Sequence, residues 1–144
     1  MHDYLDSTDP FTVEGRVAIV TGASSGLGER FCQVLAGRGA TVIGAARRVD
    51  RLEALADRIK GLVPVQCDIT DDTERSELVS IAVEHGGPDI VVNNAGISDA
   101  VTLAHEETPD RFRQVLEVNL TAAFLLSSAA AREIIEHGRG GSIV

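Results

Sequence analysis

The sequence predicts an α/β fold: a doubly wound parallel sheet of order 3-2-1-4-5, with helices on both faces and a truncated fifth strand. Two observations predict it. Continuous apolar runs rich in Val, Ile and Ala recur along the chain, as expected of strands buried on both faces of a sheet. Segments with helical periodicity separate these runs, and short turns join them, which favours right-handed crossovers between parallel strands.

Five strands are expected where the apolar runs fall, at residues 17–20, 41–46, 62–67, 89–92 and 142–144. The third run contains Pro64, which is admissible in a strand at the edge of the sheet. The second helix carries Ile59 and is expected to stop at Gly61. A long final helix begins after Thr108. Its residues 115–135 are apolar on more than one face, so both sides must be covered.

Composition and charge narrow the class of protein. The 144 residues are 44% hydrophobic, which is enough for one globular domain with a core. The formal net charge is -9, from 13 basic and 22 acidic side chains. This balance disfavours binding to nucleic acid or to anionic lipid, so neither partner is expected.

The cysteines and the chain start indicate the compartment. Cys32 and Cys67 have neither metal-ligand spacing nor a disulfide framework, so no metal site is expected and both thiols are interpreted as free and buried. Residues 1–13 are read as a loose leader that lacks the features of a secretion signal. Residues 115–131 are interrupted by polar side chains and are interpreted as too polar to span a bilayer. The sequence therefore predicts a cytoplasmic protein.

The clearest functional feature is the glycine-rich turn after the first apolar run. Gly22 allows the chain to reverse, Gly26 leaves bare backbone for a pyrophosphate, and Gly28 allows the next helix to pack closely on the strand. Ser24 and Ser25 add hydroxyl donors. Unpaired N–H groups and the helix dipole attract an anion here, so the turn predicts a site for a nucleotide diphosphate.

The end of the second strand indicates which nucleotide fits. An acidic residue there would bind ribose hydroxyls and repel a 2′-phosphate, but Ala46 takes that position and Arg47 and Arg48 follow. A guanidinium offers planar donors suited to a phosphate, which favours NADP over the alternative, NAD. The other interpretation is that both arginines are surface charges paired with Asp50 or Glu53.

Two motifs together resemble the short-chain dehydrogenase/reductase family: the spacing T-G-x-x-x-G-x-G at residues 21–28, and Asn-Asn-Ala-Gly at residues 93–96. The resemblance covers residues 14–144 and implies a Rossmann-type NAD(P)-binding domain, present as the amino-terminal half of the family's fold. It implies an oxidoreductase that interconverts a small-molecule alcohol and carbonyl by hydride transfer. The implied cofactor-binding residues are Gly22, Ser24, Ser25, Gly26, Leu27, Gly28, Arg47, Asp68, Ile69, Asn94, Ala95 and Gly96.

Asp68 and Asn119 each have two interpretations. In the family, the acidic residue after the third strand binds the adenine amino group while the next backbone N–H, here that of Ile69, meets the ring. An Asp before a helix is also a helix cap, as are the acidic residues that follow it. Asn is unfavourable within an apolar helix. The resemblance places Asn119 in a catalytic tetrad, where it kinks the helix; otherwise a neighbouring loop satisfies its amide.

The family's other catalytic groups are a Ser and a Tyr-x-x-x-Lys, and none of the three is present here; the single tyrosine is Tyr4. The chain is therefore expected to be a fragment that binds a cofactor and does not catalyse hydride transfer alone. It is also expected to be poorly soluble, because the cut fifth strand and the second face of the long helix are left uncovered. The complete protein is expected to be a homodimer or homotetramer through the second face of the long helix. The alternative function is a noncatalytic dinucleotide-binding or redox-sensing module on the same fold.

Overall fold

The computed structural model describes residues 12–98 and 103–144. Strands and helices alternate along these residues, as the apolar runs predict. In chain order the elements are β1 (Val17–Thr21), α1 (Gly26–Gly37), β2 (Thr41–Ala46), α2 (Val49–Ala56), β3 (Leu62–Gln66), α3 (Asp72–Glu84), β4 (Ile90–Val92), α4 (Pro109–Leu116), the π-helical segment η1 (Glu117–Ala122), α5 (Ala123–His137) and β5 (Ser142–Ile143).

The strands form one parallel sheet in the order β3-β2-β1-β4-β5, which confirms the predicted doubly wound fold. β1 is central, and all of its residues are buried. Thr21 lies opposite Ala45, and Val20 lies opposite Val92, so the carboxyl ends of β1, β2 and β4 meet at one edge. Pro64 lies in the edge strand β3, where the missing N–H interrupts no inner ladder.

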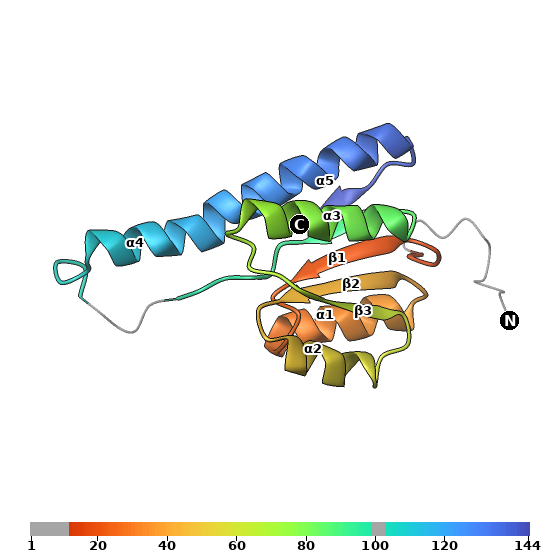
Figure 1. Ribbon diagram of the computed structural model, residues 1–144, viewed down its shortest axis with the longest axis horizontal. Coiled ribbons are helices and arrows are strands. Elements are labelled where there is room, and N and C mark those ends of the chain that lie inside the picture. The colour runs from red at the N-terminus through yellow and green to blue at the C-terminus, as the bar shows by residue number, and fades with distance from the viewer. Residues whose placement is uncertain (1–11, 99–102) are drawn as a thin grey trace, which may run out of the picture.

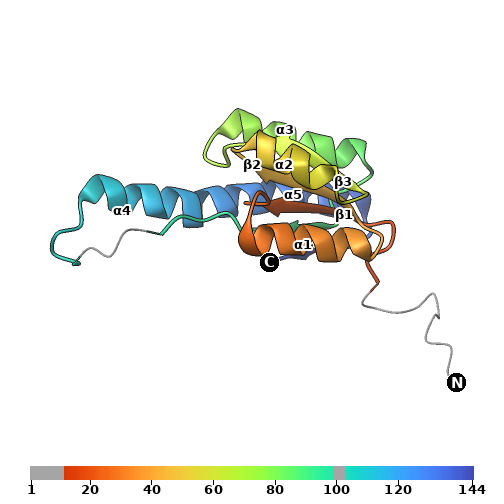
Figure 2. The ribbon, with the colours of Figure 1, turned by 90° about the horizontal axis from the view of Figure 1, so that it is seen from below.

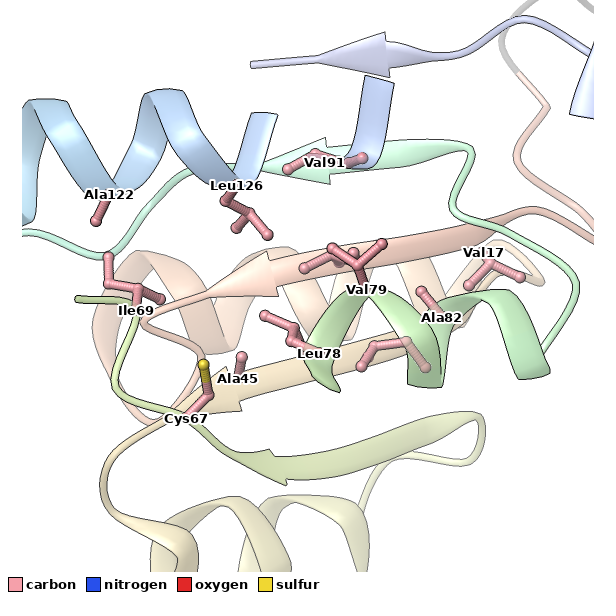
Figure 3. Packing of buried hydrophobic residues seen from close by; sticks show 13 residues of the cluster. Val17, Ala45, Cys67, Ile69, Leu78, Val79, Ala82, Val91, Ala122 and Leu126 are labelled. Carbon is pink, nitrogen blue, oxygen red and sulfur yellow. The ribbon is translucent and has the colours of Figure 1, made fainter. Parts of the chain in front are cut away.

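Helices cover both faces of the sheet (Figures 1 and 2). α1 and α2 lie on one face, over a buried cluster that includes Val20, Val42 and Leu52. α3 and α5 lie on the other face, where Leu78 and Leu126 are fully buried against the sheet (Figure 3). Each such side chain stabilises the fold by roughly 1.5–3 kcal/mol. Because both faces of the sheet are buried, the strands are held rigidly, and so is the edge where their carboxyl ends meet and the functional site lies.

α2 ends at Ala56, before the stop that was expected at Gly61. The N–H of Ile59 donates to the carbonyl of Leu55 at 3.0 Å in a turn, and the Ile59 side chain still packs on the cluster. Gly61 has a φ of +91°, and its carbonyl accepts from the N–H of Val42 at 2.8 Å. The apolar spacing continues past the helix because the turn packs on the same face, which is why periodicity alone made the helix too long.

Asp71, and not Asp68, caps α3. The Asp71 carboxylate accepts from the N–H groups of Thr73 and Glu74 at 2.8 and 2.9 Å. The Asp68 carboxylate instead accepts from the N–H and hydroxyl of Thr70, in the turn before the helix. The interpretation of Asp68 as a helix cap is therefore wrong, because the helix begins too far along the chain for its carboxylate to reach the free N–H groups.

The final helix runs without a break from Pro109 to His137 through α4, η1 and α5. Thr108 caps it as predicted, accepting from the N–H of Arg111 at 3.2 Å. α4 has no buried residue and extends beyond the sheet (Figures 1 and 2). The residues that this helix buries are Ala122, Leu126 and Ala130. The large apolar residues that it exposes are Phe112, Leu116, Leu120, Phe124, Leu125 and Ile135.

By length and composition alone, this helix of 29 residues is apolar enough to cross a membrane. Length and composition therefore do not support the interpretation that the polar residues of this helix prevent it from spanning a bilayer. A core helix passes the same test, and one face of this helix packs on the sheet through Leu126 and Ala130.

Candidate nucleotide-binding site

The glycine-rich turn joins β1 to α1 at the carboxyl edge of the sheet. Gly22 and Gly26 have φ angles of +65° and +60°, a left-handed conformation that favours glycine. A Cβ atom on Gly28 would lie 2.2 Å from the carbonyl oxygen of Gly22, so α1 can begin this close to the turn only with glycine. A Cβ atom on Gly26 would meet nothing within 4 Å. The turn is therefore tightly packed towards the protein and open on its other side.

Thr21 ties this turn to the segment that follows β4. Its Oγ1 accepts from the N–H groups of Asn94 and Ala95 at 3.1 and 3.0 Å, and Asn94 Nδ2 donates to the Thr21 carbonyl at 3.0 Å. The two loops are thus held together as one wall. Sequence reasoning counted Thr21 in the motif but gave it no role; the available signal was a hydroxyl at the end of a buried run, where it needs a partner.

A cavity of about 470 Å³ opens at this edge, within the size range of small-molecule sites. It collects most of the residues predicted to bind a cofactor: Gly22, Ser24, Ser25, Leu27, Arg47, Asp68, Ile69, Asn94, Ala95 and Gly96. Gly26, Gly28 and Asn119 are not in its lining. Two side chains that sequence reasoning did not name, Gln114 and Val118, reach it from the final helix. No local pattern indicated them, because only the fold brings that helix to this edge.

Arg47 and Arg48 both line the cavity. Arg48 Nη2 donates to Ser24 Oγ at 3.0 Å and to Ser25 Oγ at 3.1 Å, which places a guanidinium directly against the glycine-rich turn. Within residues 12–98 and 103–144, neither arginine forms an ion pair with an acidic side chain of α2. Both arginines are exposed, as that alternative supposed, but its ion pairs with Asp50 or Glu53 do not occur among the described residues.

Asp68 follows β3 and faces the same cavity. Hydrogen bonds from the N–H and Oγ1 of Thr70, at 3.0 and 2.7 Å, lower its pKa from 3.8, and the positive charge of Arg47 lowers it further against the opposing effect of burial. The carboxylate is therefore ionised at neutral pH. It presents a hydrogen-bond acceptor without a donor.

Asn119 lies in η1, beside the cavity. Its Oδ1 accepts from the N–H of Ile97 at 2.8 Å, and its Nδ2 donates to the carbonyl of Ile97 at 2.8 Å. A Cβ atom on Gly96 would lie 3.3 Å from Asn119 Oδ1. The loop thus satisfies the amide, as one interpretation predicted. The surrounding π-helical turn alters the backbone spacing of the helix, a feature that is frequent at functional sites.

The thiols are free, and the pKa of both Cys32 and Cys67 is raised to about 12, mainly by burial. For Cys67, which lines the cavity, the negative charges of Glu74 and Asp68 contribute to this rise. Both thiols stay protonated at neutral pH and act as small apolar groups. Residues 12–98 and 103–144 contain no group of three or more His, Cys, Asp or Glu side chains able to hold a metal ion.

This strand order, with a glycine-rich turn at the switch point of the sheet and a cavity above it, defines a dinucleotide-binding class of α/β domain. The family model described as short chain dehydrogenase matches residues 16–144. The chain belongs to the short-chain dehydrogenase family.

Among relatives, the chain is 38% identical over 133 residues to the 3-oxoacyl-(acyl-carrier-protein) reductase FabG of Escherichia coli, covering 88% of this chain and 53% of that protein. A short-chain dehydrogenase/reductase structure from Mycobacterium marinum superposes with a TM-score of 0.86 at 36% identity, covering 92% of this chain and 54% of the other. A 3-ketoacyl-(acyl-carrier-protein) reductase from Brucella melitensis, solved with NADH, gives 0.83 at 32% identity, covering 88% and 53%. The chain therefore spans about half the length of the proteins it matches.

Proposed function

We propose that this protein is an oxidoreductase that interconverts an alcohol and a carbonyl by hydride transfer, with NADP preferred over NAD. The observation that carries the proposal is the cavity in which the glycine-rich turn, Arg47, Arg48 and Asp68 meet. Family membership and the similarity to a reductase solved with NADH support a nicotinamide dinucleotide as the cofactor.

Groups in this cavity and in the glycine-rich turn beside it each have the chemistry that suits one part of that cofactor. The open backbone at Gly26 and the first N–H groups of α1 suit the diphosphate. Arg47 and Arg48 suit a ribose 2′-phosphate, because guanidinium groups bind phosphate with two parallel hydrogen bonds. The ionised carboxylate of Asp68 suits an amino group on the adenine ring. The diphosphate and adenine are common to NAD and NADP, so the two arginines are what favours NADP.

When bound, the nicotinamide ring supplies or accepts the hydride. In this chain, Asn119 holds Ile97, which lines the cavity, through two hydrogen bonds, and so orients that loop. The Ser and Tyr-x-x-x-Lys of the family do not occur in the sequence, whose one tyrosine is Tyr4. We therefore propose that the cavity residues named above bind the cofactor, and that hydride transfer needs catalytic groups that this chain does not supply.

Isothermal titration of the purified protein with NADPH and NADH tests the cofactor. We expect NADPH to bind roughly 10-fold or more tightly than NADH, since a phosphate held by two arginines contributes charge-assisted hydrogen bonds. Arg47→Ala and Arg48→Ala should each reduce that preference, while Arg51→Ala on the exposed side of α2 should leave it unchanged. Equal or tighter binding of NADH would contradict the preference for NADP, and failure to bind either nucleotide would contradict the function.

The second candidate function is a noncatalytic dinucleotide-binding or redox-sensing module. The same fold and cavity would serve such a module, because a fold does not by itself determine activity. NADPH oxidation by the purified protein with a panel of aldehydes and ketones separates the two. We expect tight NADPH binding without turnover. Turnover would contradict both the sensing function and the proposed inactivity of this chain. Reduction by the chain only after addition of a polypeptide carrying Ser and Tyr-x-x-x-Lys would favour the enzyme.

The proposed partner of the exposed helix face is a second copy of this chain in a homodimer or homotetramer. Phe124 is 67% exposed and Leu120 is 61% exposed, although both are large apolar side chains. Sedimentation should give an oligomer for the wild type and monomers for Phe124→Glu. Leu103→Glu, at an exposed position outside the helix, is the control. A monomeric wild type would contradict the proposal.

The proposed environment is the cytoplasm, with neither nucleic acid nor membrane as a partner. Free thiols at Cys32 and Cys67 support a reducing compartment, and the net charge of -9 opposes both anionic partners. Sedimentation with anionic vesicles tests whether the protein binds a membrane, and we expect no co-sedimentation.

A further inference from the structure

The first turn of α3 reaches back to the segment that follows β3. Glu74 Oε2 accepts from the N–H of Asp68 at 2.6 Å. Arg75 Nη1 donates to the carbonyl of Ile69 at 2.5 Å, and Arg75 is only 6% exposed, which is unusual for a charged side chain. Asp72, on the surface, is the ion-pair partner of Arg75. Two charged side chains therefore hold the backbone on either side of the Asp68–Ile69 peptide.

Other hydrogen bonds occupy most of the remaining polar groups of this segment. Asp68 Oδ1 accepts twice from Thr70, and the Asp68 carbonyl accepts from the N–H of Asp71 at 3.0 Å. Within the described residues, Asp68 Oδ2 and the N–H of Ile69 have no hydrogen-bond partner. Asp68 and Ile69 both line the cavity. The segment thus offers a ligand one acceptor and one adjacent donor.

This pair of groups distinguishes between purines. The ionised carboxylate only accepts hydrogen bonds, because its pKa is lowered, and the backbone N–H only donates. Adenine has an amino donor beside a ring-nitrogen acceptor, which is complementary. A 6-oxopurine such as hypoxanthine has a carbonyl acceptor beside a ring N–H donor, which reverses both contacts. Reversal leaves partly buried polar groups unpaired, and that costs more than a weak contact.

We propose that Arg75 and Glu74 are positioning residues that hold the Asp68–Ile69 peptide in the orientation that selects adenine over 6-oxopurines. Neither touches the ligand: Arg75 acts through the Ile69 carbonyl, and Glu74 acts through the Asp68 N–H. Bonds to charged groups are roughly twice as strong as neutral ones, which suits them to fix a backbone segment. The inference rests on the proposed binding of a nicotinamide adenine dinucleotide and deepens it.

The test compares the affinity of the purified protein for NADPH and for its hypoxanthine analogue. The wild type should prefer NADPH by at least about 10-fold, the usual effect of mispairing one or two partly buried hydrogen bonds. Arg75→Met and Glu74→Ala should each bring the ratio towards one. Glu74→Gln, which keeps an acceptor oxygen, should restore much of it. Affinity for reduced nicotinamide mononucleotide, which lacks the purine, should not change in any variant.

Asp72→Asn is the matched control, because it removes the surface ion pair of Arg75 and leaves the bond to Ile69 in place. It should keep the wild-type ratio. If Arg75→Met does not fold, Glu74→Ala decides alone. An unchanged ratio in a folded Glu74→Ala variant, with the wild type preferring NADPH, would overturn the positioning role and leave the proposed function standing. A wild type that binds neither nucleotide would overturn both.

Discussion

The glycine-rich turn and the final helix are held by the same sheet, yet they are packed in opposite ways. At the turn, one added carbon on Gly28 would come within 2.2 Å of a backbone oxygen. Along Pro109–His137, one narrow face is buried through small residues and Leu126, while Leu120 and Phe124 face outward. Close packing within the chain fixes the backbone conformation of the turn. The final helix is packed on one face only, and its other apolar face is not covered by the chain.

The comparison teaches where this chain is sensitive to change. Substitutions at the turn and on the buried helix face act through contacts within the chain, and their cost depends on how closely atoms pack. Substitutions on the exposed helix face act on association instead. Pairs of variants, one at a closely packed position and one at an exposed position, separate effects on packing from effects on association.

The largest expected effect is on the buried face of α5. Leu126→Ala should lower the free energy of unfolding by about 3 kcal/mol, because removing the fully buried side chain leaves a cavity between α5 and the sheet. Leu120→Ala, on the exposed face, should change it by less than about 0.5 kcal/mol in dilute protein. Urea unfolding followed by circular dichroism measures both. Equal losses in the two variants would erase the distinction between the faces.

A somewhat smaller loss of stability is expected at the turn, together with a loss of binding. Gly28→Ala should cost about 2 kcal/mol and abolish detectable NADPH binding, since the backbone must move away from the Gly22 carbonyl. Gly37→Ala in the same helix meets no atom within 4 Å and should be neutral or stabilising by about 0.5 kcal/mol. Thermal unfolding and titration calorimetry report the two quantities. Normal binding by the Gly28 variant would contradict the packing argument.

The helix caps extend the comparison to smaller effects. Asp71→Ala should cost about 1 kcal/mol of global stability, because α3 is packed on the sheet and its two capping bonds are lost. Thr108→Ala removes one capping bond from α4, which has no buried residue, so it should fray that helix locally. Hydrogen exchange distinguishes the outcomes. Faster exchange across the whole sheet in the Thr108 variant would show that α4 is coupled to the core.

The smallest effect concerns pH. The pKa of Asp68 is lowered from 3.8, so its contribution to stability is fully present above that value and is lost as the pH falls through the lower folded pKa. Thr70→Val removes the hydroxyl donor and should raise the Asp68 pKa, so that the loss begins at a higher pH. Carboxyl NMR titration between about pH 5 and about pH 2 measures the shift. The N–H of residue 70 still donates in this variant, so an unchanged pKa would contradict the contribution of the Thr70 hydroxyl.

Local features made the fold and much of the candidate site predictable. The strand order, the edge position of Pro64 and the cap at Thr108 follow from apolar runs, proline chemistry and a hydroxyl before a proline. The end of α2 was predicted too late because apolar spacing continues through the turn to Ile59. Asp68 was assigned as a possible cap because sequence distance to the helix start is uncertain by a few residues.

By itself the sequence determined the doubly wound fold, the glycine-rich turn and the identity of the residues that follow each strand, because these depend on local backbone chemistry and on the period of apolar side chains. Only the tertiary structure decided that Arg48 meets Ser24 and that Arg75 holds the Ile69 carbonyl. Such contacts depend on how strands and helices pack in three dimensions, and no spacing along the chain encodes the distance between two loops that the sheet brings to one edge.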